Sequence, residues 1–123
     1  ERIISNMKHY ECWKEEYLPY LDVVTGDLAS PLLGLSEEDF DRLAKDVDAI
    51  YHNGAVLNFV FPYQFLKNTN VNGTIETLRL ACKDHPKYYH YVSSYSVYDT
   101  PDNAGKKVYE NAPLNNSKGF ALA

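Results

Sequence analysis

Short apolar runs rich in β-branched and aromatic residues alternate along the chain with longer runs of helical period. The strand-like runs are 21–28 (LDVVTGDL), 47–55 (VDAIYHNGA) and 88–94 (YYHYVSS). The helix-like runs are 1–10, 35–47 and 63–82, and Ser36 is the expected N-cap of the middle one. Strands that alternate with helices need crossover connections, so this order predicts a parallel sheet in a doubly wound α/β fold.

Two stretches lack a sustained period. Residues 11–20 are expected to be irregular or weakly helical, and the tail 99–123, rich in Asn, Asp, Pro, Gly and Lys, is expected to be loop.

Composition and charge limit the kinds of molecule that this chain is expected to bind. The 123 residues suffice for one domain at most, with 45% hydrophobic and 24% charged residues. A net charge of −5 without a Lys/Arg cluster argues against nucleic acid and an anionic membrane surface. No apolar run is long enough to span a membrane. Cys12 and Cys82 fit neither a metal site nor a disulfide framework, so we expect no metal and a reducing, cytoplasmic environment.

Polar residues stand at the end of each predicted strand. These clusters are Gly26-Asp27, Asn53-Gly54-Ala55 and Ser93-Ser94. The carboxyl ends of parallel strands share one edge of the sheet, and ligands bind in the crevice there. The three clusters are therefore expected to face one site.

Each cluster has a ligand-binding interpretation and a structural one. Asp27 could accept a hydrogen bond from an exocyclic amine such as that of adenine, or it could cap a loop. Gly54 and Ala55 could let the backbone approach a ligand, or they could form a tight turn. Asn53 and His52 could contact a ligand or simply alternate across the sheet.

Ser94 is the candidate for chemistry. A hydroxyl at a strand end can donate to a substrate carbonyl and to the oxyanion that develops there, although such serines are often turn residues. Asn70 and Gly73 are poor helix formers inside the helix expected over 63–82. Either Gly73 lets another backbone come close and Asn70 holds a water, or the helix simply tolerates two weak helix formers.

Tyr followed four residues later by Lys can supply an acid and a cation on one helical face. The two pairs with this spacing, Tyr10/Lys14 and Tyr63/Lys67, are attributed to chance.

Four motifs together resemble a known family. They are GDL (26–28), YHNGAVLNFVFPY (51–63), NVNGT (70–74) and YVSSYSVY (91–98). They are similar to the extended short-chain dehydrogenase/reductase family. With the linker PLLGLS (31–36), they look more narrowly like the thioester reductase domains of nonribosomal peptide and polyketide synthetases and carboxylic acid reductases.

The resemblance implies a cofactor site and a reaction. The implied cofactor-binding residues are Asp27, Leu28, Asn53, Gly54, Ala55, Asn70 and Ser93, with Asp27 and Leu28 beside the adenine and Asn70 as the structural Asn of its helix. Ser94 would polarise the carbonyl. The cofactor would be NADP(H) rather than NAD(H), and the substrate a phosphopantetheine-linked acyl or peptidyl thioester on a carrier protein, reduced to an aldehyde or alcohol.

The family pattern extends beyond what this sequence contains. A GxxGxxG loop and the first two strands of the fold are absent, and the Tyr and Lys partners of Ser94 are expected beyond Ala123. Residues 1–123 are therefore expected to be a partial NAD(P)-binding Rossmann domain, comprising strands three to five. It would lack the N-terminal Gly-rich βαβ unit and the C-terminal substrate region, would need other segments of the same domain, and would be inactive alone. The alternatives are another extended reductase, a sugar-nucleotide epimerase, or a non-catalytic nucleotide-binding module.

Overall fold

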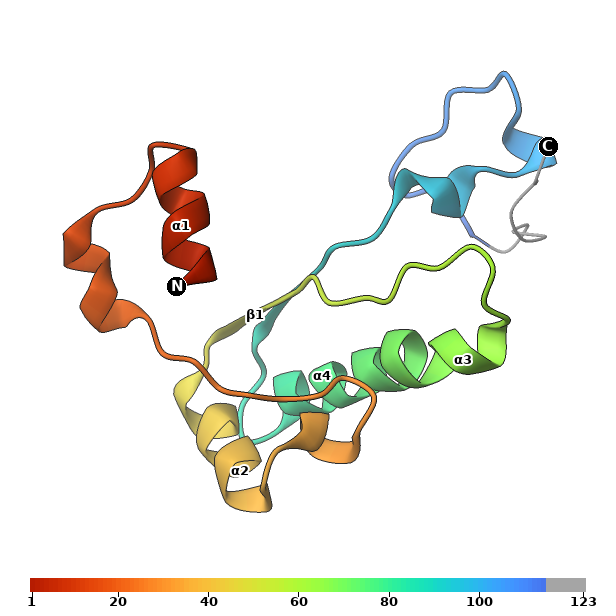
Figure 1. Cartoon of the computed structure of the whole chain (residues 1–123). Coiled ribbons are helices and arrows are strands. Elements are labelled where there is room, and N and C mark those ends of the chain that lie inside the picture. Colours follow the sequence, from red (N-terminus) through yellow and green to blue (C-terminus); the bar gives the residue numbers. More distant parts are fainter. Residues whose placement is uncertain (115–123) are drawn as a thin grey trace.

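The computed structural model describes residues 1–114, in which helices cover one side of a small two-stranded sheet (Figure 1). The α-helices are α1 (Arg2–His9), α2 (Glu37–Asp46), α3 (Tyr63–Lys67) and α4 (Gly73–Cys82). The strands are β1 (Ala49–His52) and β2 (Tyr88–Tyr91). Short 3₁₀ helices cover Glu15–Tyr20, Pro31–Gly34, Tyr95–Tyr98 and Pro101–Asn103. Segment 11–20, expected to be irregular or weakly helical, contains one of these 3₁₀ helices. Residues 115–123, the end of the predicted loop, lie outside the described chain.

The two strands pair in parallel, so the predicted α/β fold with a parallel sheet is confirmed for this part of the chain. Ala49 pairs with Tyr88, and His52 pairs with Tyr91. The helical segment from α3 to α4 connects them, as a parallel pair requires. Both strands are shorter than predicted.

The strand predicted over 21–28 is wrong. This run forms no ladder with any described segment, and the sheet holds only β1 and β2. The Asp27 N–H instead donates to the Leu33 carbonyl within a local loop, at 2.7 Å. Val23 is 81% exposed. Apolar, β-branched residues favour strand geometry, but a strand also needs a neighbour to accept its backbone hydrogen bonds.

The helix predicted over 63–82 runs without a break, but its hydrogen-bonding pattern changes along its length. A π-helical turn, Asn68–Asn72, joins α3 to α4. Gly73 opens α4 in contact with the loop, because a Cβ placed on it would lie 2.6 Å from the Leu28 carbonyl oxygen. The close approach inferred from Gly73 is therefore present.

Helix α2 begins as the sequence predicts. The Asp39 N–H donates to Ser36 Oγ at 3.1 Å, and the Ser36 hydroxyl donates back to the Asp39 carboxylate at 2.9 Å. Acidic residues fill the first turn, where the helix dipole favours them.

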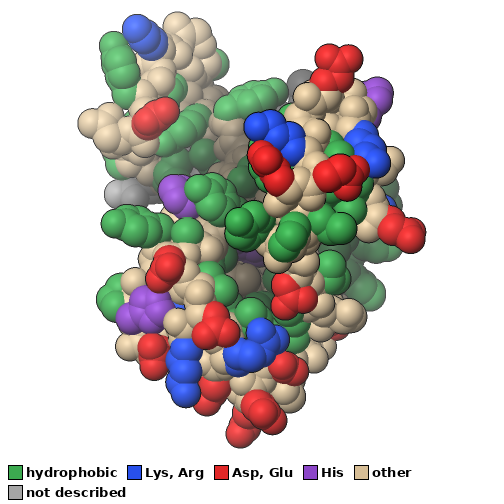
Figure 2. All heavy atoms as spheres, turned by 90° about the vertical axis from the view of Figure 1, so that its left-hand side faces the viewer, with side chains coloured by type: hydrophobic (Ala, Val, Ile, Leu, Met, Phe, Trp, Pro, Cys, Tyr) green, Lys and Arg blue, Asp and Glu red, His purple; other side chains and the backbone are tan. Residues whose placement is uncertain are grey.

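A compact core holds α2, α4 and β1 together. Phe40, Ala44 and Leu80 are buried, and the partly buried Leu43 and Ile50 pack against them. Charged side chains gather on α2, at the lower end of the face in Figure 2, while apolar side chains stand out above it. This distribution gives α2 one buried and one solvated side.

The sheet has one covered face and one open face within the described residues. On the covered face, Tyr89 Oη lies 2.7 Å from Thr77 Oγ1 of α4. On the other face, the Tyr51 and His90 rings stack at 4.4 Å, and Tyr51 is 72% exposed. In the described part of the chain no helix is long and apolar enough to cross a membrane, and no group of His, Cys, Asp and Glu is arranged to hold a metal.

Replacing Gly73 with Ala is expected to destabilise the fold, because the new methyl would meet the Leu28 backbone rather than a movable side chain. We expect a loss of about 1–3 kcal/mol, reduced somewhat by the better helix propensity of Ala. Urea unfolding of the full-length protein measures this loss.

Gly54→Ala is the matched control. Its new methyl would meet only the flexible end of the Leu28 side chain, which can turn away. Equal stability of the two variants would contradict the proposed backbone contact.

Candidate functional site

The carboxyl edge of the sheet brings two of the predicted clusters together. The ladder continues one step past the strands, because the Val92 N–H donates to the His52 carbonyl at 3.0 Å. The chain segments that follow, Asn53–Ala55 and Ser93–Ser94, therefore leave the sheet from neighbouring strands at one edge. Both segments are exposed there.

The third cluster reaches the same edge without forming a strand. Leu28 lies against Gly54, since a Cβ on that glycine would collide with Leu28 Cδ1. The Leu28 carbonyl also rests on Gly73, as described above. Leu28 thus brings the end of the 21–28 run to this edge through packing rather than strand pairing, and a common site for Gly26-Asp27 and the other two clusters stays a prediction.

Asp27 closes its own loop. Its carboxylate accepts from the Ala29 N–H and from the Ser30 hydroxyl, both at 2.9 Å. The hydrogen bond from the Ala29 backbone, followed by that from Ser30, lowers the pKa of Asp27. Each carboxylate oxygen retains lone pairs that can accept a further donor. The capping role is therefore observed, and contact with adenine stays a prediction.

The loop after Asp27 is held in an unusual backbone conformation that sequence reasoning missed. Leu32 and Leu33 have φ values of +52° and +60°, in the left-handed region. The Leu32 N–H donates to Glu76 of α4 at 3.0 Å, and Arg79 donates to the same carboxylate at 2.7 Å. The Arg79 bond is the main cause of the lowered pKa of Glu76. Glu76 is mostly buried against this loop, and a single acid within a helical run gives no sequence signal for such a contact.

Asn70 clamps the chain just after the Asn53–Ala55 segment. Its side-chain Oδ1 accepts from the Val56 N–H at 2.8 Å, and its Nδ2 donates to the Val56 carbonyl at 2.9 Å. The amide thus pairs with Val56 as a neighbouring strand would. Asn70 holds the backbone of this edge, and its direct contact with a cofactor stays a prediction.

His52 continues this network into the helix. Its Nε2 lies 3.0 Å from Thr74 Oγ1, and the Thr74 hydroxyl donates to the Asn70 carbonyl at 2.7 Å. A hydroxyl has one proton, so Thr74 accepts from His52, and Nε2 carries the hydrogen. His52 is only 5% exposed, and this burial lowers its pKa. The side chain faces the helix, which favours the structural interpretation.

Ser94 sits where the β2 segment turns into the 3₁₀ helix Tyr95–Tyr98. The Ser96 N–H donates to Ser94 Oγ at 3.2 Å, so the side chain caps this helix. Accepting that bond uses a lone pair and leaves the hydroxyl proton available to an incoming oxygen. The serine is exposed, as a group that meets substrate must be.

The tyrosine pairs contribute nothing to this edge. Tyr10 ends α1, whereas Lys14 precedes the next helix, so they do not share a helical face. Tyr63 begins α3 and is 65% exposed. The stretch GFALA, which resembles the approach to a YxxxK motif, falls in residues 115–123 outside the described chain.

Comparison with known proteins identifies the family. The profile of an NAD-binding family described as "Male sterility protein" matches residues 1–119. The chain belongs to this family. Among its relatives, a linear gramicidin synthase from Brevibacillus parabrevis is 50% identical over 93 residues, which are 76% of this chain and 2% of that protein. The L-2-aminoadipate reductase large subunit of Candida glabrata is 45% identical over 91 residues, which are 74% of this chain and 7% of that protein.

Two solved structures share the fold. The terminal R domain from the myxalamid PKS-NRPS biosynthetic pathway is 50% identical, with a TM-score of 0.70 over 78% of this chain and 25% of that chain. The PhqB reductase domain from Penicillium fellutanum is 34% identical, with a TM-score of 0.61 over 76% of this chain and 25% of that one. The resemblance to reductase domains of peptide and polyketide synthetases is therefore confirmed, and the chain spans a small part of each relative.

Removing the Asn70 amide is expected to free the Val56 backbone. In Asn70→Leu both hydrogen bonds are lost, while Asn70→Asp keeps an acceptor for the Val56 N–H. We expect the Val56 amide to exchange hydrogen about tenfold faster in the Leu variant than in the wild type, with Asp between them. Amide hydrogen exchange of the full-length protein measures this rate.

Asn72→Leu serves as the control, because it removes only a bond to the Asn68 side chain. An unchanged Val56 rate in Asn70→Leu would show that the clamp does not hold this segment.

Burial of His52 predicts a loss of stability in mild acid. Because its folded pKa is lowered, the unfolded chain takes up the proton first once the pH falls below about 6.5, the ordinary value. The stability contributed by neutral His52 is fully present above that pH, and it declines as the pH falls toward the lowered pKa of His52 in the folded state. Urea unfolding across this range should show the decline.

His52→Gln is expected to flatten this pH dependence, because Gln can donate to Thr74 without titrating. The same change at the exposed His9 is the control. An identical pH dependence in wild type and His52→Gln would rule out His52 as its source.

Proposed function

We propose that this chain forms part of an NAD(P)H-dependent reductase domain that reduces a carrier-bound acyl or peptidyl thioester to an aldehyde or alcohol. The observation that carries the proposal is the position of Ser94. Ser94 stands at the carboxyl edge of the parallel sheet, on the strand next to the one that leads into Asn53–Ala55. Its oxygen accepts from the Ser96 N–H, which leaves its proton available. The names of the related proteins, reductases and peptide synthetases, support the same chemistry.

The cofactor would lie along this edge and supply a hydride. Gly54 and its neighbours Asn53 and Ala55 are exposed at this edge, where a ligand could lie against their backbone, while Leu28 packs where a side chain on Gly54 would stand. Asp27 retains lone pairs for the adenine amine, with Leu28 beside it. The remaining proposed cofactor contacts are Asn53, Ala55, Asn70 and Ser93. Membership in an NAD-binding family supports a nicotinamide cofactor, and we propose NADPH over NADH.

Ser94 would act on the carbonyl oxygen of the thioester. As hydride arrives at the carbonyl carbon, negative charge moves to that oxygen, and a hydroxyl donor stabilises the developing oxyanion. Collapse of the resulting oxyanion would break the C–S bond, expel the thiolate and leave the aldehyde. A second hydride, together with a proton, would give the alcohol.

The proposal includes partners and a compartment. The substrate would be carried as a phosphopantetheine thioester on a carrier protein, in the cytoplasm. Residues 1–123 would work with further segments of the same reductase domain, which supply the Gly-rich phosphate loop and the Tyr and Lys partners of Ser94. Two observations support the need for further segments. This chain covers only 25% of each solved reductase chain, and one face of the β1–β2 sheet is uncovered within the described residues.

Ser94→Ala in the full-length protein tests the proposal. Loss of an oxyanion donor is expected to lower kcat by roughly two to three orders of magnitude while leaving cofactor binding in place. Oxidation of NADPH in the presence of an acyl-pantetheine thioester measures the rate, and parallel assays with NADH test the cofactor preference.

Ser96→Ala is the matched control, because the Ser96 backbone N–H that contacts Ser94 is retained. An unchanged rate in Ser94→Ala would remove this residue from the mechanism. Absence of thioester reduction by the wild type, together with tight NADPH binding, would favour the non-catalytic nucleotide-binding alternative.

A further inference from the structure

The chain contains two Asn-Gly pairs, Asn53-Gly54 and Asn72-Gly73. In such a pair the backbone nitrogen of the glycine can attack the side-chain amide carbon of the asparagine, because glycine has no side chain that crowds the approach. The attack also requires that the glycine N–H is free and that the backbone can bend to bring the two atoms together. The structure gives the two pairs opposite surroundings in both respects.

The pair Asn53-Gly54 is unrestrained. Both residues are exposed and lie between β1 and α3, outside any helix or strand. The Gly54 N–H donates to no backbone carbonyl among residues 1–114. Leu28 packs at the α-carbon of Gly54, but only through the flexible end of its side chain. The backbone nitrogen and the Asn53 side chain are therefore free to meet.

The pair Asn72-Gly73 is held at both atoms. The Gly73 N–H donates to the Asn68 carbonyl in the π-helical turn. Asn72 has helical φ and ψ values of −67° and −39°, and its amide donates to the Asn68 side chain at 3.1 Å. Gly73 is also buried against the Leu28 backbone. The same reaction at Asn72 would first require this turn to unwind.

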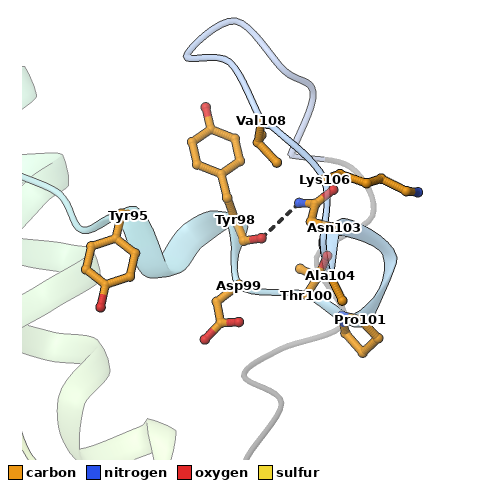
Figure 3. Close-up of a pocket in the computed structure, with 9 residues that line it drawn as sticks. All are labelled: Tyr95, Tyr98, Asp99, Thr100, Pro101, Asn103, Ala104, Lys106 and Val108. Carbon is orange, nitrogen blue, oxygen red and sulfur yellow. Dashed lines mark hydrogen bonds between the residues drawn. The ribbon is translucent and has the colours of Figure 1, made fainter.

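Asn103 offers a second comparison, because it is followed by the small residue Ala104 and lines the cavity in Figure 3. Its amide donates to the Tyr98 carbonyl at 2.8 Å, the dashed line in that view. The Ala104 N–H donates to the Pro101 carbonyl at 3.2 Å. Both reacting atoms are again held, and the Ala104 methyl adds crowding.

We propose that Asn53 is a site of spontaneous deamidation. The Gly54 nitrogen bonds to Cγ of Asn53, the Cγ–Nδ2 bond breaks, and the Gly54 amide proton leaves with Nδ2 as ammonia. The product is a cyclic imide. Water then adds to either carbonyl of the ring and breaks its bond to the nitrogen, which gives aspartate or isoaspartate. No group is oxidised or reduced, and water is the only co-reactant.

The reaction replaces a neutral amide with a carboxylate at the carboxyl edge of the sheet. In the isoaspartate product the backbone also runs through the former side chain, which lengthens the segment that joins β1 to Gly54. The modification itself does not depend on the reductase function. Its effect on cofactor binding rests on that proposed function, because a carboxylate here would repel the phosphates of a dinucleotide at this edge.

The test follows deamidation of the full-length protein in mildly alkaline buffer, both folded and in urea. Peptide mass spectrometry measures conversion at each asparagine, and enzymatic methylation detects isoaspartate. In the folded protein Asn53 should convert at least about tenfold faster than Asn72 and Asn103. In urea the two Asn-Gly pairs should convert at similar rates. Gly54→Ala should slow the reaction at Asn53 several-fold, because its methyl crowds the attacking nitrogen.

Two results would overturn the modification. One is an Asn53 rate in the folded protein no higher than that of Asn72. The other is an Asn53 rate that is strongly reduced in the folded protein relative to urea, since this would show that the fold restrains the pair.

Asn53→Asp tests the effect of the new charge. NADPH titration followed by fluorescence should show several-fold weaker binding than in the wild type, and added salt should narrow the difference. Equal affinity would overturn the charge effect. Failure of the wild type to bind NADPH would contradict the proposed function, while the deamidation rates would still decide the modification.

Discussion

The contact between the Leu28 backbone and Gly73 is the constraint on which the candidate site depends. The run 21–28 has no ladder to hold it, so its position comes from packing on the first turn of α4. The absence of a side chain at Gly73 lets the two backbones meet, and Leu28 then reaches Gly54 at the sheet edge. A single glycine thus links a loop, a helix and a strand end that lie far apart in sequence.

The features that the sequence predicted are those with local causes. Ser36 and the acids after it define the start of α2, and the period of residues 63–82 defines a helix. The edge location of Asn53 and Ser94 followed from the parallel order of β1 and β2. Local signals were sufficient because a cap, a period and a crossover each act within a short stretch of chain.

Other features depend on contacts that no local pattern encodes. The run 21–28 has the composition of a strand but no partner strand among the described residues, so a prediction from composition alone was wrong. Asn70 of the π-helical turn pairs with Val56 of the loop after β1, and Thr74 of α4 contacts His52 at the end of β1. The sequence indicated only that Asn70 is a poor helix former within a helix, and it gave no sign of the hydrogen bond between the Leu32 N–H and the mostly buried Glu76.

The pairing of β1 with β2 also bears on how the chain is made. The strands and their crossover helix form one uninterrupted stretch, from Ala49 to Tyr91, so the unit can assemble as soon as that stretch leaves the ribosome. Its outer backbone groups and the Tyr51–His90 face then meet solvent before any later segment is synthesised. Unpaired strand edges of this kind favour pairing with other chains, so this unit on its own is expected to be prone to aggregation.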